Sequence, residues 1–219
     1  MLTRAMIVVG GGSSARFDGD KLLEVVAGSP LVAHTVNAVR DLVDKCVLVS
    51  RLDLIEAISG FGLGVDIVPG GNTRTLSEMA GLAALGDEFD LIGIHDAARP
   101  LIMADLVEAL FAAADTVGGA VPVLEPDTLL VDRRSLRPIE RAVTVQTPQV
   151  FRGPELFAAY VRSAEVGYDA QDTVEIVNQF GHLEIAAIPG DSSNVKVTYP
   201  DDLELVRLRL EDPARSEPR

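Results

Sequence analysis

The segment Met6-Ile-Val-Val9, followed directly by Gly10-Gly-Gly-Ser-Ser14, decides the fold class of this 219-residue chain. A short apolar run that breaks into glycines is typical of a buried strand that leads into a tight loop. Further apolar runs of the same kind predict strands at residues 46–49, 65–68, 91–94 and 119–123. Because these runs are nearly continuously apolar, we expect strands that are buried on both faces.

Helical patterns lie between the apolar runs. They predict helices over residues 52–58, 76–85 and 105–114, and a further helix after Ser29-Pro30. Ser29 is expected to cap that helix, with Pro30 at its first position. Strands that alternate with helices in this way predict an α/β fold, with a mainly parallel sheet and helices on both of its faces.

Residues 125–149 interrupt this alternation. Two β-prone runs, residues 129–131 and 142–145, flank an Arg-rich turn at residues 133–138 and predict a protruding β-arm. Beyond the arm, the pattern predicts helices at residues 154–164 and 172–178, a strand at residues 183–187 and a last helix from Pro200.

The composition limits the possible partners and compartments. The chain has 33 acidic and 19 basic side chains, a net charge of −14 and 47% hydrophobic residues. So acidic a chain is a poor candidate for binding nucleic acid or for docking on anionic membranes. No apolar run approaches the roughly 18 residues of a membrane span, and the run at residues 5–9 is too short for a signal peptide. Cys46 is the single cysteine, which rules out an internal disulfide framework. We therefore expect a cytoplasmic protein with one domain over residues 1–210 and a flexible tail over residues 211–219.

Polar residues at the carboxyl ends of the strands are the candidates for function, because ligands of open α/β sheets bind there. In the first loop, Gly10, Gly11 and Gly12 would let backbone N–H groups approach phosphate oxygens. Arg16 and Lys21 would add positive charge. The Gly-Lys-Ser/Thr ending of a P-loop is absent, and an ordinary tight turn is the alternative.

The same loop also fits a variant of the dinucleotide-binding fingerprint. Its pattern is Gly10-x-Gly12-x-x-Ala15, and Ser50-Arg51 follows the second strand where an acidic residue is usual. An arginine at that position could bind the 2′-phosphate of NADP, so an NADP site remains an alternative.

The segment Gly70-Gly-Asn-Thr-Arg-Thr-Leu-Ser77 follows the third strand. A glycine turn that enters a helix can hold a base edge or an anion at the helix N-terminus. The alternative is an ordinary turn in which Asn72 or Thr75 caps the helix.

The segment His95-Asp-Ala-Ala-Arg-Pro100 follows the fourth strand. A carboxylate in this apolar context is costly unless it is paired or bound to a metal, so Asp96 is a candidate Mg²⁺ ligand and Arg99 a candidate phosphate partner. An Asp96–Arg99 ion pair is the alternative, and His95 is expected to be a packed histidine.

Lys196 is a further candidate because the chain has only three lysines, Lys21, Lys45 and Lys196. It lies in the β-like segment Asn194-Val-Lys-Val-Thr198, just before the last helix. A solvated strand residue is the alternative.

In their order and spacing these motifs resemble the cytidylyltransferases of the non-mevalonate isoprenoid pathway, which make diphosphocytidyl-methylerythritol from CTP and 2-C-methyl-D-erythritol 4-phosphate. The resemblance spans about residues 5–210. Its most specific parts are His95-Asp-Ala-Ala-Arg-Pro100, Gln146-Thr-Pro-Gln-Val-Phe151 and Asn194-Val-Lys-Val-Thr198, with Gly70-Gly-x-x-Arg-x-x-Ser77 added. It implies a Rossmann-like, GT-A-like nucleotidyltransferase fold, Mg²⁺ as cofactor, and a homodimer in which the β-arm interlocks with the second subunit.

The resemblance also implies a role for each matching residue. The residues whose backbone would surround the CTP phosphates are Gly10, Gly11 and Gly12. The catalytic cations would be Arg16, Lys21 and Lys196. Those that would face the cytosine and ribose are Gly71, Asn72 and Ser77, with Asp96 beside Mg²⁺ and the nucleotide. Those that would hold the sugar phosphate, partly across the dimer, are Arg99, Thr128, Arg141 and Thr147.

The chain departs from the family pattern mainly on the acceptor side. Ser14 replaces a loop glycine, Leu130 a lysine and Gln171 a threonine, and Arg141 is about two residues closer to Thr147 than the family spacing. The first loop also resembles that of the molybdenum-cofactor nucleotidyltransferases. Transfer to another acceptor, such as a pentitol phosphate or a pterin, and an inactive nucleotide-binding relative therefore remain alternatives.

Overall fold

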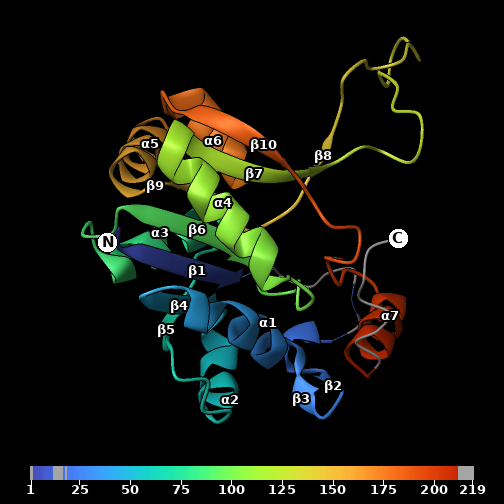
Figure 1. Cartoon of the computed structure of the whole chain (residues 1–219). Coiled ribbons are helices and arrows are strands. Elements are labelled where there is room, and N and C mark those ends of the chain that lie inside the picture. The colour runs from blue at the N-terminus through green and yellow to red at the C-terminus, as the bar shows by residue number, and fades with distance from the viewer. Residues whose placement is uncertain (1, 12–16, 18, 212–219) are drawn as a thin grey trace.

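The strands predicted from the apolar runs form the centre of the computed structural model, which describes residues 2–11, 17 and 19–211 (Figure 1). The main sheet has eight strands in the order β10-β7-β9-β6-β1-β4-β5, with β8 paired to β7. Its strands are β1 (Arg4–Gly10), β4 (Lys45–Ser50), β5 (Asp66–Pro69), β6 (Leu91–Asp96), β7 (Gly118–Leu124), β8 (Thr144–Val145), β9 (Gln149–Arg152) and β10 (Glu184–Pro189).

The sheet is mainly parallel, as the sequence predicts. β1 pairs in parallel with β4 and β6, β4 with β5, and β7 with β10. The short strand β9 is antiparallel to both β6 and β7, and therefore joins the two parallel parts of the sheet. The sequence pattern does not predict β9, because four residues that begin with a polar Gln149 carry too little periodicity to separate them from the arm.

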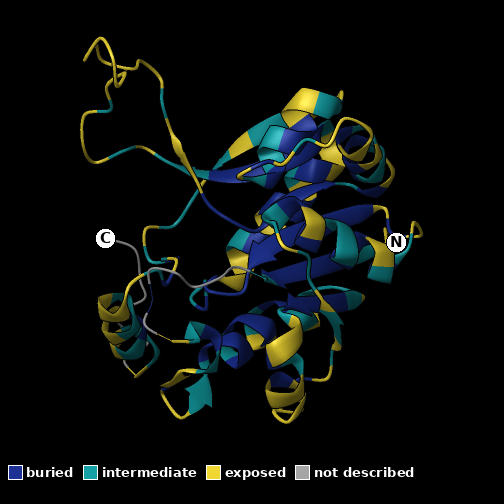
Figure 2. Cartoon of the chain, turned by 180° about the vertical axis from the view of Figure 1, so that it is seen from behind, coloured by how far each residue is buried: buried dark blue, intermediate teal, exposed yellow. Residues whose placement is uncertain are grey.

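Helices cover both faces of the sheet. One core includes α1 (Leu31–Val39), α2 (Ile55–Ser59) and α4 (Ala104–Val117), and the other α3 (Arg74–Leu85), α5 (Gly153–Glu165) and α6 (Thr173–Phe180). The alternation of side chains along β1 explains the division, since Met6 and Val8 pack into the first core and Ile7 into the second. Figure 2 shows the buried residues concentrated in the strands and on the inward sides of these helices.

The entry to α1 differs from the expectation. Ser29 does not cap the helix: Ser29–Pro30 forms β3, which pairs with β2 (Val25–Val26), and the N-cap residue is Pro30, without a side-chain cap. The tight turn between the two strands, with Ala27 at φ 45° and Gly28 at φ 82°, explains the difference. Ser29 is held by this hairpin and is not placed at the helix end.

The arm protrudes as predicted, but its pairing is not the predicted one. Residues 129–131 and 142–145 do not pair with each other. Instead Thr144–Val145 extends the sheet beside β7, while the arm closes on itself through a bridge between Val131 and Pro138. The Asp132 N–H donates to the Arg137 carbonyl at 2.9 Å and fixes this inner turn. Figures 1 and 2 show the arm extending from the sheet with mostly exposed residues.

The chain ends in α7 (Pro200–Glu211), which packs through Val206 against a small cluster that includes Leu31, Ala98 and Val197. The helix ends one residue beyond the predicted domain boundary, and residues 212–219 of the predicted tail lie outside the described residues. Three short 3-10 turns complete the structure, at Lys21–Leu23, Arg40–Leu42 and Leu52–Leu54. Within the described residues, no helix has both the length and the apolar character to cross a membrane.

A close approach of α3 to the sheet gives the first prediction. A Cβ atom at Gly81 would lie 2.4 Å from the Ile7 Cγ2 atom and 3.0 Å from the Val49 Cγ2 atom. Replacing an exposed helical glycine with alanine normally stabilises a protein by about 0.5–1 kcal/mol. Here we expect Gly81→Ala to destabilise the protein by about 1–3 kcal/mol, because the added methyl group overpacks the contact with the sheet. Urea unfolding measures the change.

Ala83 lies on the same helix but is exposed, so Ala83→Gly isolates the effect of helix propensity. It should cost about 0.5–1 kcal/mol. A Gly81→Ala variant that is more stable than the wild-type protein would show that α3 does not press on β1 and β4 as described.

Candidate active site

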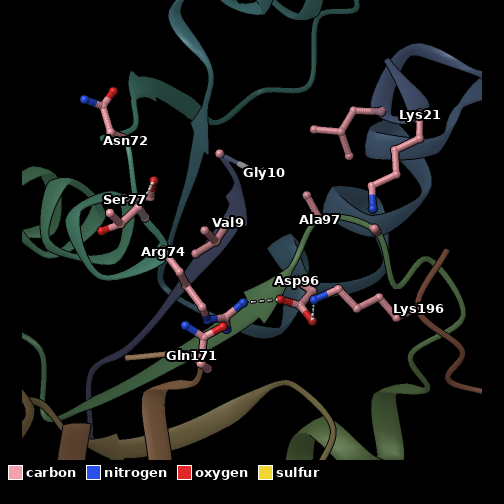
Figure 3. A pocket seen from close by; sticks show the side chains of 14 residues that line it. Val9, Gly10, Lys21, Asn72, Arg74, Ser77, Asp96, Ala97, Gln171 and Lys196 are labelled. Atoms are coloured by element: carbon pink, nitrogen blue, oxygen red, sulfur yellow. Dashed lines mark hydrogen bonds and ion pairs between the residues drawn. The ribbon is translucent and has the colours of Figure 1, made fainter. Parts of the chain in front are cut away.

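A pocket of about 390 Å³ opens at the carboxyl ends of β1 and β6, where the strand-end rule places the ligand (Figure 3). Its walls come from six separate segments of the chain. The lining residues are Val9, Gly10, Gly11, Lys21, Leu22, Asn72, Thr73, Arg74, Ser77, Asp96, Ala97, Ala98, Gln171 and Lys196.

The first glycines form one wall, and neither has room for a side chain. A Cβ atom at Gly10 would lie 2.7 Å from the Leu22 Cδ1 atom, and one at Gly11 would lie 2.5 Å from the Ser77 Oγ atom. The backbone itself therefore lines the pocket here, as the approach of a phosphate requires. Gly12 and Arg16, the other predicted residues of this loop, lie outside the described residues.

The segment of residues 70–77 forms the opposite wall and begins α3. Neither Asn72 nor Thr75 caps the helix: the cap is Thr73, whose Oγ1 atom accepts a hydrogen bond from the Leu76 N–H at 3.2 Å. Asn72 and Ser77 line the pocket, whereas Gly71 is not among the lining residues, and a Cβ atom there would lie 2.3 Å from the Leu76 Cβ atom. A side chain at Gly71 would collide with the first turn of the helix.

Asp96 lies at the floor of the pocket and is 5% exposed. Its Oδ1 atom accepts from Arg74 Nη1 at 2.6 Å, and its Oδ2 atom lies 2.9 Å from Lys196 Nζ and 3.2 Å from Arg99 Nε. Figure 3 shows Arg74 and Lys196 converging on the carboxylate from opposite sides. Burial opposes ionisation, but Arg74, Lys196 and Arg99 together hold the pKa of Asp96 well below its usual value.

The Asp96–Arg99 ion pair considered as an alternative is thus present, but as one part of a larger cluster. Asp96 keeps its charge because three cations surround it, rather than because it caps the next helix.

Arg74 extends this cluster away from the pocket to a second buried carboxylate, Glu78. Arg74 Nε lies 2.8 Å from Glu78 Oε1, and the Glu78 side chain is 1% exposed. Glu78 also accepts hydrogen bonds from Tyr160 Oη at 2.5 Å and Thr173 Oγ1 at 2.8 Å. Glu78 was missed from the sequence; the available signal was its spacing of four residues from Arg74 on one helix.

The two lysines that line the pocket are held differently. Lys21 Nζ donates to the Val197 carbonyl at 2.8 Å, while Lys196 Nζ reaches Asp96. The segment around Lys196 is not the expected β-like strand but a loop, fixed where the Val197 N–H donates to the Ala98 carbonyl at 2.8 Å. This loop therefore lies along the extension of β6 and brings Lys196 beside Asp96, one hundred residues away in the sequence.

The predicted acceptor-binding residues do not gather in this pocket within one chain. Arg99 donates through Nη1 to the Asn194 carbonyl at 2.7 Å. Thr147 is buried, and its Oγ1 atom accepts from the Asp96 N–H at 3.0 Å. Thr128 and Arg141 are exposed on the arm, which extends away from the pocket (Figure 1).

Among the described residues that line the pocket, Asp96 offers the one carboxylate that a metal could use. Among the described residues there is no group of three or more His, Cys, Asp or Glu side chains placed to hold a metal, and Asp96 is the one acidic residue that lines the described part of the pocket. A carboxylate offers roughly four lone-pair sites, of which Arg74, Lys196 and Arg99 use three. Asp96 thus fits the role of a single ligand for a Mg²⁺ ion whose other ligands are waters and substrate phosphates.

The alternative NADP site loses its basis. Arg51, the candidate partner for a 2′-phosphate, pairs through Nη1 with Asp20 at 2.7 Å and through Nη2 with Asp53. Its guanidinium forms ion pairs with two carboxylates, and the negative charge of these carboxylates would repel a phosphate.

A mainly parallel sheet with a glycine-walled, lysine-bearing pocket at its carboxyl edge is the arrangement expected of a nucleotidyltransferase with a Rossmann-like fold. A family model described as 2-C-methyl-D-erythritol 4-phosphate cytidylyltransferase (IspD) matches residues 4–212. The chain belongs to this family, as its motifs suggest.

Named relatives agree over nearly the full length. The chain is 33% identical to the 2-C-methyl-D-erythritol 4-phosphate cytidylyltransferase of Solibacter usitatus, covering 90% of this chain and 87% of that protein. It is 36% identical to the protein of the same name from Cereibacter sphaeroides, covering 92% and 94%. The crystal structure of the Thermus thermophilus enzyme of that name superposes with a TM-score of 0.79 at 28% identity, covering 97% of this chain and all of that one.

His95 gives a prediction about acid stability. As expected it is a packed histidine: its Nε2 atom donates to the Arg99 carbonyl at 3.1 Å, and its Nδ1 atom accepts from Thr147 Oγ1 at 3.0 Å. Burial lowers the pKa of His95 to about 4 from 6.5. Between these values the unfolded chain binds a proton that the folded protein does not, so stability falls as the pH drops from 6.5 to 4.

From pH 7 to pH 4.5 we expect the free energy of unfolding of the wild-type protein to fall by about 2–3 kcal/mol more than that of His95→Gln. Urea unfolding at each pH measures both proteins. Parallel pH profiles would contradict the assignment of a neutral, buried imidazole.

Proposed function

We propose that this chain transfers the cytidylyl group of CTP to 2-C-methyl-D-erythritol 4-phosphate and releases pyrophosphate. The observation that carries the proposal is the pocket in which Lys21, Lys196 and Asp96 meet beside Gly10 and Gly11, in a chain that belongs to the cytidylyltransferase family. This places the reaction in the synthesis of isoprenoid precursors.

The reaction joins two anions and needs no covalent intermediate. A phosphate oxygen of the acceptor attacks the α-phosphorus of CTP, the bond to the bridging oxygen of the β-phosphate breaks, and the electron pair leaves with pyrophosphate. Catalysis therefore depends on position and on positive charge that compensates the phosphates in the transition state.

The described residues divide this work. The backbone at Gly10 and Gly11 would receive the phosphates, and Lys21 and Lys196 would neutralise the charge that develops during transfer. Arg16, which lies outside the described residues, would add a third cation. Asn72 and Ser77 would contact the base and ribose. Asp96 would hold Mg²⁺ together with the phosphate oxygens. When bound, Mg²⁺ would neutralise negative charge on the α-phosphate and on the departing pyrophosphate.

We infer that the active form is a homodimer in which the arm serves the second subunit. The arm exposes several large apolar side chains, among them Leu129 (74%), Leu136 (71%) and Ile139 (50%). An exposed apolar surface of this kind favours burial against a partner. Thr128 and Arg141 would then reach the acceptor in the partner's pocket, which explains why they are distant from the pocket of their own chain.

A cytoplasmic location stays a prediction.

Gln171 lines the pocket where the family pattern has a threonine, so the identity of the acceptor is tested directly. Pyrophosphate release should be measured for CTP, GTP, ATP and UTP, with methylerythritol phosphate, with ribitol phosphate and without acceptor. Release that requires CTP, methylerythritol phosphate and Mg²⁺ together, and that stops on chelation, supports the proposal. Release with ribitol phosphate alone would transfer it to another acceptor, and no release at all would overturn it.

The two pocket lysines should be essential for rate. Removing one preorganised contact to transition-state charge commonly costs about 10²–10³ in kcat, or about 2.7–4 kcal/mol, and we expect this for Lys21→Ala and for Lys196→Ala. The third lysine is the matched control, since Lys45 pairs with Asp66 at the amino end of β4. Lys45→Ala should turn over normally. A pocket variant that does so too would lose its assigned role.

Mixing Lys196→Ala with Arg141→Ala, each of which we expect to lose most of its activity, tests whether the arm crosses between subunits. A dimer of Lys196→Ala with Arg141→Ala has one site with both changes and one site with neither, if the arm of each chain completes the other's pocket. Co-refolding equal amounts should therefore restore about a quarter of the wild-type activity. If each arm serves its own chain, the mixture will remain as inactive as its components.

A further inference from the structure

Arg74 and Glu78 form a buried ion pair that leads from the pocket into the protein interior. The Arg74 side chain is 19% exposed and bridges Asp96 at the pocket floor and Glu78 behind it, with N–O distances of 2.6 and 2.8 Å. Glu78 does not line the pocket. Its ion pair with Arg74 connects it directly to a residue that lines the pocket.

Glu78 is itself held from two further helices. Tyr160 of α5 donates to its Oε2 atom at 2.5 Å, and Thr173 of α6 donates to its Oε1 atom at 2.8 Å. Thr173 is the first residue of α6, and its position is fixed because Asp172 caps that helix and accepts from Gln149 Nε2 of β9 at 2.6 Å. The carboxylate of Glu78 therefore has one defined position relative to the sheet.

The burial of this pair needs a reason other than stability. Taking both charges out of water costs more than a surface pair would, and buried pairs can often be replaced by apolar residues without loss of stability. The exposed pair Arg207–Glu204 on α7 shows what an ordinary helical ion pair looks like in the same chain. Glu78 differs from it because Arg74 continues to a residue of the active site.

We propose that Glu78 is a positioning residue for nucleotidyl transfer, which fixes the guanidinium of Arg74 so that Arg74 holds the Asp96 carboxylate in place. The inference rests on the proposed function, because it concerns the rate of that reaction. Glu78 also balances the charge of Arg74. Arg74 therefore positions the Asp96 carboxylate, while Lys21 and Lys196 bind the phosphates.

The test compares Glu78→Gln with the double variant Arg74→Met/Glu78→Leu. Altering a residue that orients a ligand typically costs about 10–100-fold, so we expect kcat to fall about 10-fold in the first and about 100-fold in the second. The KM for CTP should change by less than about threefold, because Lys21 and Lys196 remain to bind the phosphates in both variants, and the double variant removes the charge of Arg74 together with that of Glu78, which balances it. Glu204→Gln, which breaks the exposed pair on α7, is the matched control and should leave kcat and KM unchanged.

Thermal unfolding of each variant shows whether a lower kcat comes from displacement of Asp96 or from a less stable protein. A purely structural pair predicts that the apolar double variant, if folded, keeps a wild-type kcat, and that result would overturn the proposal. Should the double variant not fold, Tyr160→Phe decides: it removes one hydrogen bond from Glu78, and the proposal requires a several-fold lower kcat at unchanged KM. A wild-type protein that does not release pyrophosphate from CTP would instead refute the proposed function, independently of these variants.

Discussion

An ionised carboxylate at the buried end of a central strand governs the arrangement of this site. Asp96 ends β6 among apolar strands, where an unpaired charge would be prohibitively costly. It is tolerated because Arg74, Arg99 and Lys196 approach it from three separate segments of the chain. The requirement for compensation thus brings the start of α3, the end of β6 and the loop before α7 to one point.

The same compensation explains how so acidic a chain could accept anionic substrates. The net charge of −14 is a property of the whole surface, whereas the described pocket has one carboxylate against Lys21, Lys196 and Arg74. Charges within a few ångströms dominate over distant ones that solvent and salt screen. The overall charge argues against extended polyanions as partners but leaves small phosphorylated substrates acceptable.

Local patterns in the sequence predicted those parts of the molecule that depend on local physics. The apolar run at residues 6–9 and its glycines placed β1 and one pocket wall, and the strand-end rule placed Asp96 correctly. Lys196 could be singled out by the scarcity of lysine and by the segment Asn194-Val-Lys-Val-Thr198, but its contact with Asp96 could not be predicted, because it spans one hundred residues and leaves no local pattern. The spacing of four residues from Arg74 is compatible with an ion pair that involves Glu78, but the sequence does not show that this pair is buried, because Tyr160 and Thr173 come from two other helices. The pairing of the arm was wrong for a similar reason, as β7 competes for Thr144–Val145.

The antiparallel strand β9 has a consequence for the order in which the chain can assemble. β6 and β7 share no ladder of their own and meet only through β9, which follows the arm in the sequence. During synthesis, the strands up to β6 can pair with one another, but β7 and β10 cannot join them until the whole arm has been made. The arm is therefore an insertion that must be synthesised before β9 can join β6 to β7. The part of the arm that precedes β8 can change in length without altering the register of the main sheet, whereas the place of the arm in the chain, between β7 and β9, cannot move.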